Sequence, residues 1–197
     1  MSDVIHDFTT DVPVWRPRLT PVNLDEATSD QREALKVTPS NTKVSDYVLT
    51  LAHDVEILKE RSPLFNAIMY NRGGLSRTGR ELGATAASVV NHCIYCAAVH
   101  ASRYNKLTKS GEVMKGLFED GNNVRLDPYN QAIVDFAFKL SKSPPEATPD
   151  DIQNLRKVGL SDEEIVDLIL SAALFGWANR LMHVLGDPVT TGSADSG

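Results

Sequence analysis

Helix start signals recur along this chain and favour a helical fold. Asp127 stands directly before Pro128, so that a capping side chain is followed by a proline at the first helical position. The same order occurs at 148–149, and Ser161 begins a capping box. No stretch of the sequence alternates polar and apolar residues as a half-buried strand does. The sequence therefore predicts an all-α fold, a compact bundle of about eight helices with short connections.

The boundaries of the predicted helices follow from caps, apolar spacing and glycine or proline stops. Asp54, inside a run that Ser45 caps, can begin a second helix. Pro63 is predicted in the first turn of a separate helix. The predicted ranges are about 29–37, 45–58, 62–71, 77–91, 94–107, 110–119, 128–142, 148–157 and 162–185.

Prolines at positions 13, 17 and 21 make a helix impossible in the first part of the chain. Residues 1–22 are therefore predicted to form an extended N-terminal arm. A disordered tail is the alternative, but Trp15 is better placed against its own domain or a neighbouring subunit than in water. Residues 23–188 are predicted to form a single all-helical domain, and residues 189–197 a flexible tail.

The composition is that of an ordinary globular protein, with 23% charged and 42% hydrophobic residues. A formal net charge of -6 argues against nucleic acid and anionic membranes as partners. The N-terminal sequence lacks the pattern of a secretory signal, and no run of about 18 apolar residues predicts a membrane span. We therefore expect a cytoplasmic protein, in which thiols are kept reduced.

Residues 81–100 concentrate the reactive side chains of the chain and include both of its cysteines. Cys93, Cys96 and His100 are three and then four residues apart, so they share one face of a helix. A helix that begins near Cys93 places both sulfurs in its first turn, where free N–H groups and the helix dipole stabilise a thiolate. In a reducing compartment this pair indicates redox chemistry or metal binding rather than a structural disulfide.

Glu81 would be about 18 Å from Cys93 if one straight helix joined them. A bend near Asn91 and His92 would instead give two antiparallel helices and bring Glu81 within reach of His100. Glu81 would then orient His100, and His100 would serve the cysteines as a base, which is the arrangement of nucleophilic catalysis. The predicted site is therefore a helical hairpin.

The pattern E-x11-C-x-x-C-x3-H, formed by Glu81, Cys93, Cys96 and His100, resembles the alkylhydroperoxidase D / carboxymuconolactone decarboxylase family. The nearest match is its peroxidase-related branch. The likeness is specific over about 43–110 and looser over the C-terminal helices.

This resemblance implies an all-helical subunit, assembly into homo-oligomers such as trimers or hexamers, and reduction of hydroperoxides by the cysteine pair. By position, Cys96 would attack the peroxide, Cys93 would resolve the product, and Glu81 and His100 would form a proton relay. A dithiol or a protein reductant would supply the electrons, and no cofactor or metal is expected. Tyr95 departs from the pattern, because alkylhydroperoxidase D has a second histidine inside the cysteine pair.

Two other functions are compatible with these residues. A decarboxylase or related lyase on the same scaffold would be a non-redox enzyme, although ring-opening decarboxylation does not need a dithiol. A zinc-binding oligomeric stress protein would use Cys93, Cys96, His100 and Glu81 as ligands. A single short cluster is weak evidence for such a zinc site.

The remaining candidate side chains have lesser claims. On the last predicted helix, Asn179 and Trp177 could line the site, with core packing the stronger interpretation for Trp177. His92 could support the site without reacting. His53 and His183 are interpreted as structural or surface residues.

Overall fold

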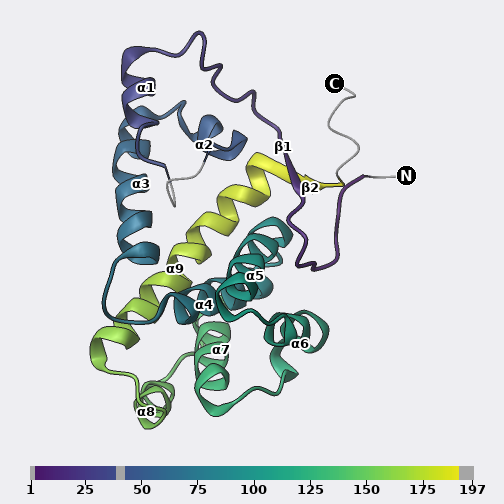
Figure 1. Cartoon of the computed structure of the whole chain (residues 1–197), viewed down its shortest axis with the longest axis vertical. Coiled ribbons are helices and arrows are strands. Elements are labelled where there is room, and N and C mark those ends of the chain that lie inside the picture. The colour runs from purple at the N-terminus through teal and green to yellow at the C-terminus, as the bar shows by residue number, and fades with distance from the viewer. Residues whose placement is uncertain (1–2, 39–42, 191–197) are drawn as a thin grey trace. The chain divides into compact units, whose positions relative to one another are not determined.

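The computed structural model describes residues 3–38 and 43–190, which form helices and one pair of short strands (Figure 1). The chain divides into two compact units, each described separately below. The first unit comprises Met1–Ile5, Pro13–Asn71 and Leu181–Gly197. The second comprises His6–Val12 and Arg72–Arg180. The predicted all-α fold class is confirmed.

The first unit contains three helices and the strand pair. Ser45 and Asp54 cap two of the helices, and Asp54 accepts a hydrogen bond from the Ile57 N–H at 3.1 Å, so the predicted restart at Asp54 is confirmed. The elements are β1 (Val14–Pro17), α1 (Ser29–Ala34), α2 (Asp46–Leu51), α3 (Val55–Tyr70) and β2 (Gly186–Val189).

The strand pair is a small addition to the helical fold that the sequence pattern did not predict. β1 and β2 are antiparallel, with Val14 opposite Val189. Each strand has four residues and contains a proline, so neither can show an alternating pattern. Trp15 is 5% exposed and packs edge-on against Tyr47, and a Cβ at Gly186 would lie 2.3 Å from its ring. The predicted burial of Trp15 is therefore confirmed, within its own chain.

Two predicted helix boundaries in this unit are wrong. Pro63 lies in the middle of α3 rather than at the start of a separate helix. A proline removes only one backbone hydrogen bond, and the burial of Leu58, Phe65 and Met69 along α3 stabilises the helix on both sides of it. The helix predicted over about 29–37 ends earlier, at Ala34.

The second unit is helical in all its regular elements among the described residues. Most of its predicted boundaries agree with the structure to within one or two residues, and Ser76 caps α4. The elements are α4 (Arg77–Val90), α5 (Ile94–Thr108), α6 (Glu112–Asp120), the 3-10 helix η2 (Gly121–Asn123), α7 (Pro128–Ser141), α8 (Pro149–Lys157) and α9 (Asp162–Leu185), whose last five residues belong to the first unit.

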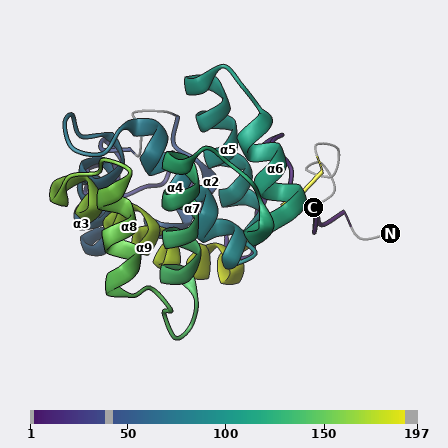
Figure 2. The same cartoon turned by 90° about the horizontal axis from the view of Figure 1, so that it is seen from below.

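Helix α4 is the centre of the second unit, and it packs against both α5 and α7 (Figure 2). Every residue from Gly79 to Val89 is buried. Small side chains allow this close approach: a Cβ at Gly83 would lie 2.7 Å from Cδ1 of Leu168 on α9. The candidate site residues on α4 are therefore held by packing on all sides of the helix.

Helix α9 is long and apolar enough, by length and composition, to span a membrane, and half of that stretch is buried inside the protein. One helix that meets this criterion is weak evidence for a membrane span, because buried core helices meet it too. Trp177 on this helix is 41% exposed, so its predicted place in the core is wrong. It stands on the outer face of α9 with Val166 and Leu170, whereas Phe175 and Met182 are buried.

The predicted division into an arm (1–22), one domain (23–188) and a flexible tail (189–197) stays a prediction. Within the arm, Val4 forms an isolated bridge to Val189. Residues 191–197 of the tail lie outside the described residues.

Candidate functional site

Helices α4 and α5 form the predicted hairpin. The chain leaves α4 at Asn91, turns through His92 in a left-handed conformation with φ of 54°, and enters α5 with Cys93 at the N-cap. The Cys93 N–H donates to the Ser88 carbonyl at 2.9 Å, which closes the turn. Asn and His tolerate such turn conformations better than bulky branched residues do. The bend between the two helices is therefore confirmed.

Both cysteines lie at the N-terminal end of α5 and are buried, with 4% of Cys93 and 6% of Cys96 exposed. Both are free thiols. The Cys96 thiol donates to the Cys93 sulfur and lowers the pKa of Cys93; burial opposes this, and the Cys96 backbone N–H and the Asn179 side chain add to the lowering. These contacts lower the pKa of Cys93 at the turn of the hairpin, whereas the family pattern makes Cys96 the attacking cysteine.

Below the cysteines, Glu81 on α4 contacts His100 on α5, as the hairpin predicts. The Glu81 Oε2 and His100 Nδ1 atoms form a buried hydrogen bond. Glu81 is fully buried, and His100 is 3% exposed, with the ring of Phe175 edge-on against it at 4.1 Å. His100 follows Cys96 by four residues, one helical turn along the same face of α5.

Arg77 completes this buried chain from the other side. Its Nε donates to Glu81 Oε1 at 2.7 Å, and its Nη2 donates to the same oxygen. Arg77 was not among the predicted site residues. Its position four residues before Glu81 on one helix is a sequence signal that could have identified it.

The protonation states follow from these contacts. Burial opposes the charge on Glu81, but His100, Arg77 and Arg103 outweigh it and hold the pKa of Glu81 below its ordinary value. Burial also lowers the pKa of His100, and Glu81 only partly offsets this. An ionised carboxylate can only accept, so a neutral His100 must donate from Nδ1 and keep its lone pair on Nε2. A neutral imidazole in this tautomer can take a proton.

Asn179 of α9 joins the site at the cysteine end. It is fully buried, and it contacts Ser88, Asn91 and Cys93. The sequence placed Asn179 near the site only as a possibility, because the approach of α9 to α4 is a tertiary contact that no local pattern encodes.

Three other histidines have contacts of their own. His92 stacks on Phe8 of the 6–12 segment, with ring centroids 5.3 Å apart. His53, in the first unit, contacts the Thr20 carbonyl at 2.9 Å through Nε2. His183 also belongs to the first unit, where its carbonyl accepts from Arg18.

No group of three or more His, Cys, Asp and Glu side chains in the described part of the chain is arranged to hold a metal ion. The zinc alternative therefore has no candidate site among these residues. The same carboxylate and imidazole that would serve as ligands are instead bonded to each other.

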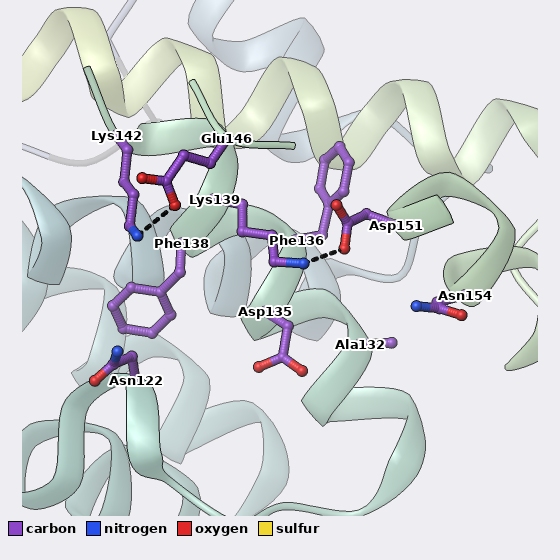
Figure 3. A pocket seen from close by; sticks show the side chains of 10 residues that line it. All are labelled: Asn122, Ala132, Asp135, Phe136, Phe138, Lys139, Lys142, Glu146, Asp151 and Asn154. Carbon is purple, nitrogen blue, oxygen red and sulfur yellow. Dashed lines mark hydrogen bonds and ion pairs between the residues drawn. The ribbon is translucent and has the colours of Figure 1, made fainter. Parts of the chain in front are cut away.

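A cavity of about 380 Å³ lies elsewhere in the second unit, and its lining includes none of the hairpin residues (Figure 3). Four of its charged side chains form two ion pairs, Lys139 with Asp151 and Lys142 with Glu146, and Asp135 accepts a hydrogen bond from Gln131 (Figure 3). The cavity therefore lacks the reactive groups that the hairpin concentrates.

The chain is similar to known proteins over the region that contains the hairpin. The model of the carboxymuconolactone decarboxylase family matches residues 56–111. The chain is 22% identical over 116 residues to the uncharacterized protein YdfG of Bacillus subtilis (strain 168). The aligned residues cover 59% of this chain and 79% of that protein.

Solved structures with the same fold include an alkylhydroperoxidase AhpD core, an uncharacterized peroxidase-related protein from Ralstonia eutropha JMP134. It is 28% identical, with a TM-score of 0.76, and the match covers 91% of this chain and 94% of that one. A peroxidase-related protein from Silicibacter sp. TM1040 is 22% identical (TM-score 0.71; 86% and 91% covered). The debrominase Bmp8 is 17% identical (TM-score 0.73; 89% and 94% covered). The last two likenesses show the fold alone.

Proposed function

We propose that this chain, which belongs to the carboxymuconolactone decarboxylase family in its alkylhydroperoxidase D-like, peroxidase-related branch, is a thiol-dependent peroxidase. Its substrates are hydrogen peroxide or organic hydroperoxides. The observation that carries the proposal is the buried hairpin, in which two thiols at a helix N-terminus stand above a histidine anchored by an ionised glutamate.

The first step is attack by Cys96 on the peroxide. His100 accepts the Cys96 proton, and the sulfur electron pair forms a bond to one peroxide oxygen while the O–O bond breaks. The departing oxygen takes this proton back from His100 and leaves as an alcohol or as water. Cys96 is oxidised to a sulfenic acid, and Glu81 stabilises the charge on His100 while it holds the proton.

The second step forms the disulfide. The Cys93 sulfur attacks the Cys96 sulfenic acid, and water leaves with the hydroxyl oxygen. A dithiol, small or carried by a protein, then reduces the Cys93–Cys96 disulfide and is itself oxidised to a disulfide. The net reaction turns one hydroperoxide and one dithiol into an alcohol, water and an oxidised dithiol.

A stopped-flow assay of the reduced protein tests this function. We expect one equivalent of hydroperoxide to be consumed in a single turnover, and continuous consumption when dithiothreitol is present. No consumption under either condition would overturn the proposal. Cys96→Ser should abolish turnover, whereas Cys93→Ser should stop at a trapped sulfenic acid; the reverse pattern would exchange the two roles.

A reductive dehalogenase is the second candidate, because a solved structure with this fold is a debrominase. A dithiol can replace a carbon-bound bromine by hydrogen, with release of bromide and formation of the disulfide. Bromide release from a bromopyrrole, measured beside peroxide consumption with the same reduced protein, separates the two candidates. The lyase alternative requires that activity survive loss of both cysteines, so a double Cys→Ser variant tests it.

The outer face of α9 supports self-association as a further part of this proposal. Val166, Leu170 and Trp177 recur at helical spacing and are 51%, 43% and 41% exposed. We propose that a second copy of the chain covers this apolar stripe in a cytoplasmic homo-oligomer. Light scattering should give an oligomer for the native chain and a smaller mass for Trp177→Glu; a monomer for the native chain would contradict it.

A further inference from the structure

The hydrogen bonds around Asn179 have a fixed direction. The Asn91 amide nitrogen donates to the Ala87 carbonyl at 2.9 Å and to Asn179 Oδ1 at 3.2 Å. The Ser88 hydroxyl donates to the Ala84 carbonyl at 2.8 Å, and its oxygen faces Asn179 Nδ2 at 3.2 Å. These contacts join α4 to α9 in a buried network inside the second unit.

Two backbone carbonyls determine which end of the Asn179 amide is which. A carbonyl only accepts, so the Asn91 group at Ala87 must be the nitrogen, and its second N–H must meet an oxygen on Asn179. The Ser88 hydroxyl has one proton and donates it to the Ala84 carbonyl. The Ser88 oxygen must therefore accept from a nitrogen on Asn179. The amide therefore cannot flip.

One N–H of Asn179 remains after these bonds. Cys93 lies beside it, because Ser88 accepts from the Cys93 N–H through its carbonyl and from Asn179 through its hydroxyl oxygen, and hydrogen bonding by the Asn179 side chain lowers the pKa of the Cys93 thiol. We infer that Asn179 is a positioning residue for the cysteine pair: it presents a fixed N–H that keeps Cys93 as the hydrogen-bond acceptor of the two sulfurs. Of the two side chains that act on the Cys93 thiol, Cys96 is titratable and Asn179 is uncharged. The partners of Asn179 at the end of α4, Ser88 and Asn91, are uncharged as well.

This inference rests on the proposed dithiol chemistry and assigns direction to its last step. A thiolate of the dithiol reductant attacks the Cys96 sulfur, a new S–S bond forms, and the Cys93–Cys96 bond breaks. The electron pair stays on Cys93 as a thiolate that the Asn179 N–H stabilises. The second thiol of the reductant then displaces Cys96 and leaves as the oxidised dithiol. Asn179 thus makes Cys93 the leaving sulfur and Cys96 the sulfur that the reductant engages.

A thiolate titration tests the inference without any substrate. In a Cys96→Ser background, which keeps a hydroxyl donor, the ultraviolet absorbance of the thiolate reports the pKa of Cys93. Asn179→Leu keeps the side-chain shape and removes the donor, so we expect a rise of about one unit, or about tenfold less thiolate below the pKa. Asn179→Asp puts a negative charge on the sulfur and should raise the pKa further.

Controls keep a folding defect apart from the predicted effect. Ser171→Ala removes another buried polar group of α9, which bonds the Leu168 carbonyl, and should leave the titration unchanged. Asn91→Ala releases the partner of the Asn179 oxygen and should give a smaller rise, even if Asn179→Leu does not fold. The inference would be overturned if the pKa of Cys93 stayed unchanged in all of these Asn variants. A lower pKa of Cys93 in Asn179→Asp would also overturn it. The titration is independent of peroxide consumption, so its failure and the failure of the peroxidase proposal are separate results.

Discussion

Replacing Glu81 by Gln is the perturbation that the buried hairpin makes most informative. The change keeps the shape of the side chain and removes its charge. Glu81 now accepts from Arg77 on one oxygen and from His100 on the other. A Gln side chain has one oxygen and one N–H₂ group for these two positions. The positive charge of Arg77 favours the oxygen, so the N–H₂ group faces His100.

The imidazole must then change its tautomer. Nδ1 of His100 has to accept from the amide, and the ring proton moves to Nε2, which can no longer act as a base. The carboxylate that stabilises a protonated His100 is lost as well. Loss of a general base lowers a rate by about 10²- to 10⁴-fold, so we expect a decrease of that size in peroxide consumption. The lost hydrogen bonds to a charged group should cost about 1.5–3 kcal/mol of stability.

Single-turnover stopped-flow kinetics of the reduced variant measure this effect, with urea unfolding as the stability assay. Glu146→Gln is the matched control. Glu146 is an exposed carboxylate that forms an ion pair with Lys142, four residues before it, and therefore loses its charge in the same way. It should change stability by about 0.5 kcal/mol or less and leave the rate unchanged. A folded Glu81→Gln protein with the wild-type rate would refute the relay.

Three further predictions concern the same unit. Arg77→Gln removes a charge that holds the pKa of Glu81 down, so the acid limb of the pH–rate profile should move to higher pH; an unmoved limb would mean that Arg77 does not act on the relay. Because burial lowers the pKa of His100 from 6.5, the unfolded chain binds a proton that the folded chain refuses, and stability should fall as the pH drops below about 6.5. His100→Gln should remove that part of the loss in urea titrations at several pH values. Gly74→Ala places a Cβ 2.0 Å from Oδ2 of Asp167 at a φ of +59°, so thermal unfolding should show a loss of at least about 1 kcal/mol, and unchanged stability would contradict this close contact.

The sequence predicts those parts of the fold that local chemistry controls. The bounds of α9 agree with the predicted 162–185 because Ser161 and Glu164 form the capping box at one end and Gly186 follows the other. The bend before Cys93 is likewise local, since it depends on the break between two helical patterns.

Features that depend on distant contacts escape such reasoning. Pro63 is tolerated inside α3 because tertiary packing stabilises that helix, and β1 and β2 exist because residues far apart in the chain pair with each other. Trp177 is apolar like a core residue but lies on the outer face of α9. Asn179 gains its position only because α9 meets α4.

The most direct test of a redox function for the hairpin is the mass of the protein after one equivalent of hydroperoxide. We predict that the reduced chain loses two hydrogen atoms and that peptide mapping finds a Cys93–Cys96 disulfide. Cys93→Ser should instead gain one oxygen atom at Cys96, and Cys96→Ser should remain unoxidised. An unchanged mass of the native chain, with both thiols still free, would contradict the proposed peroxidase chemistry.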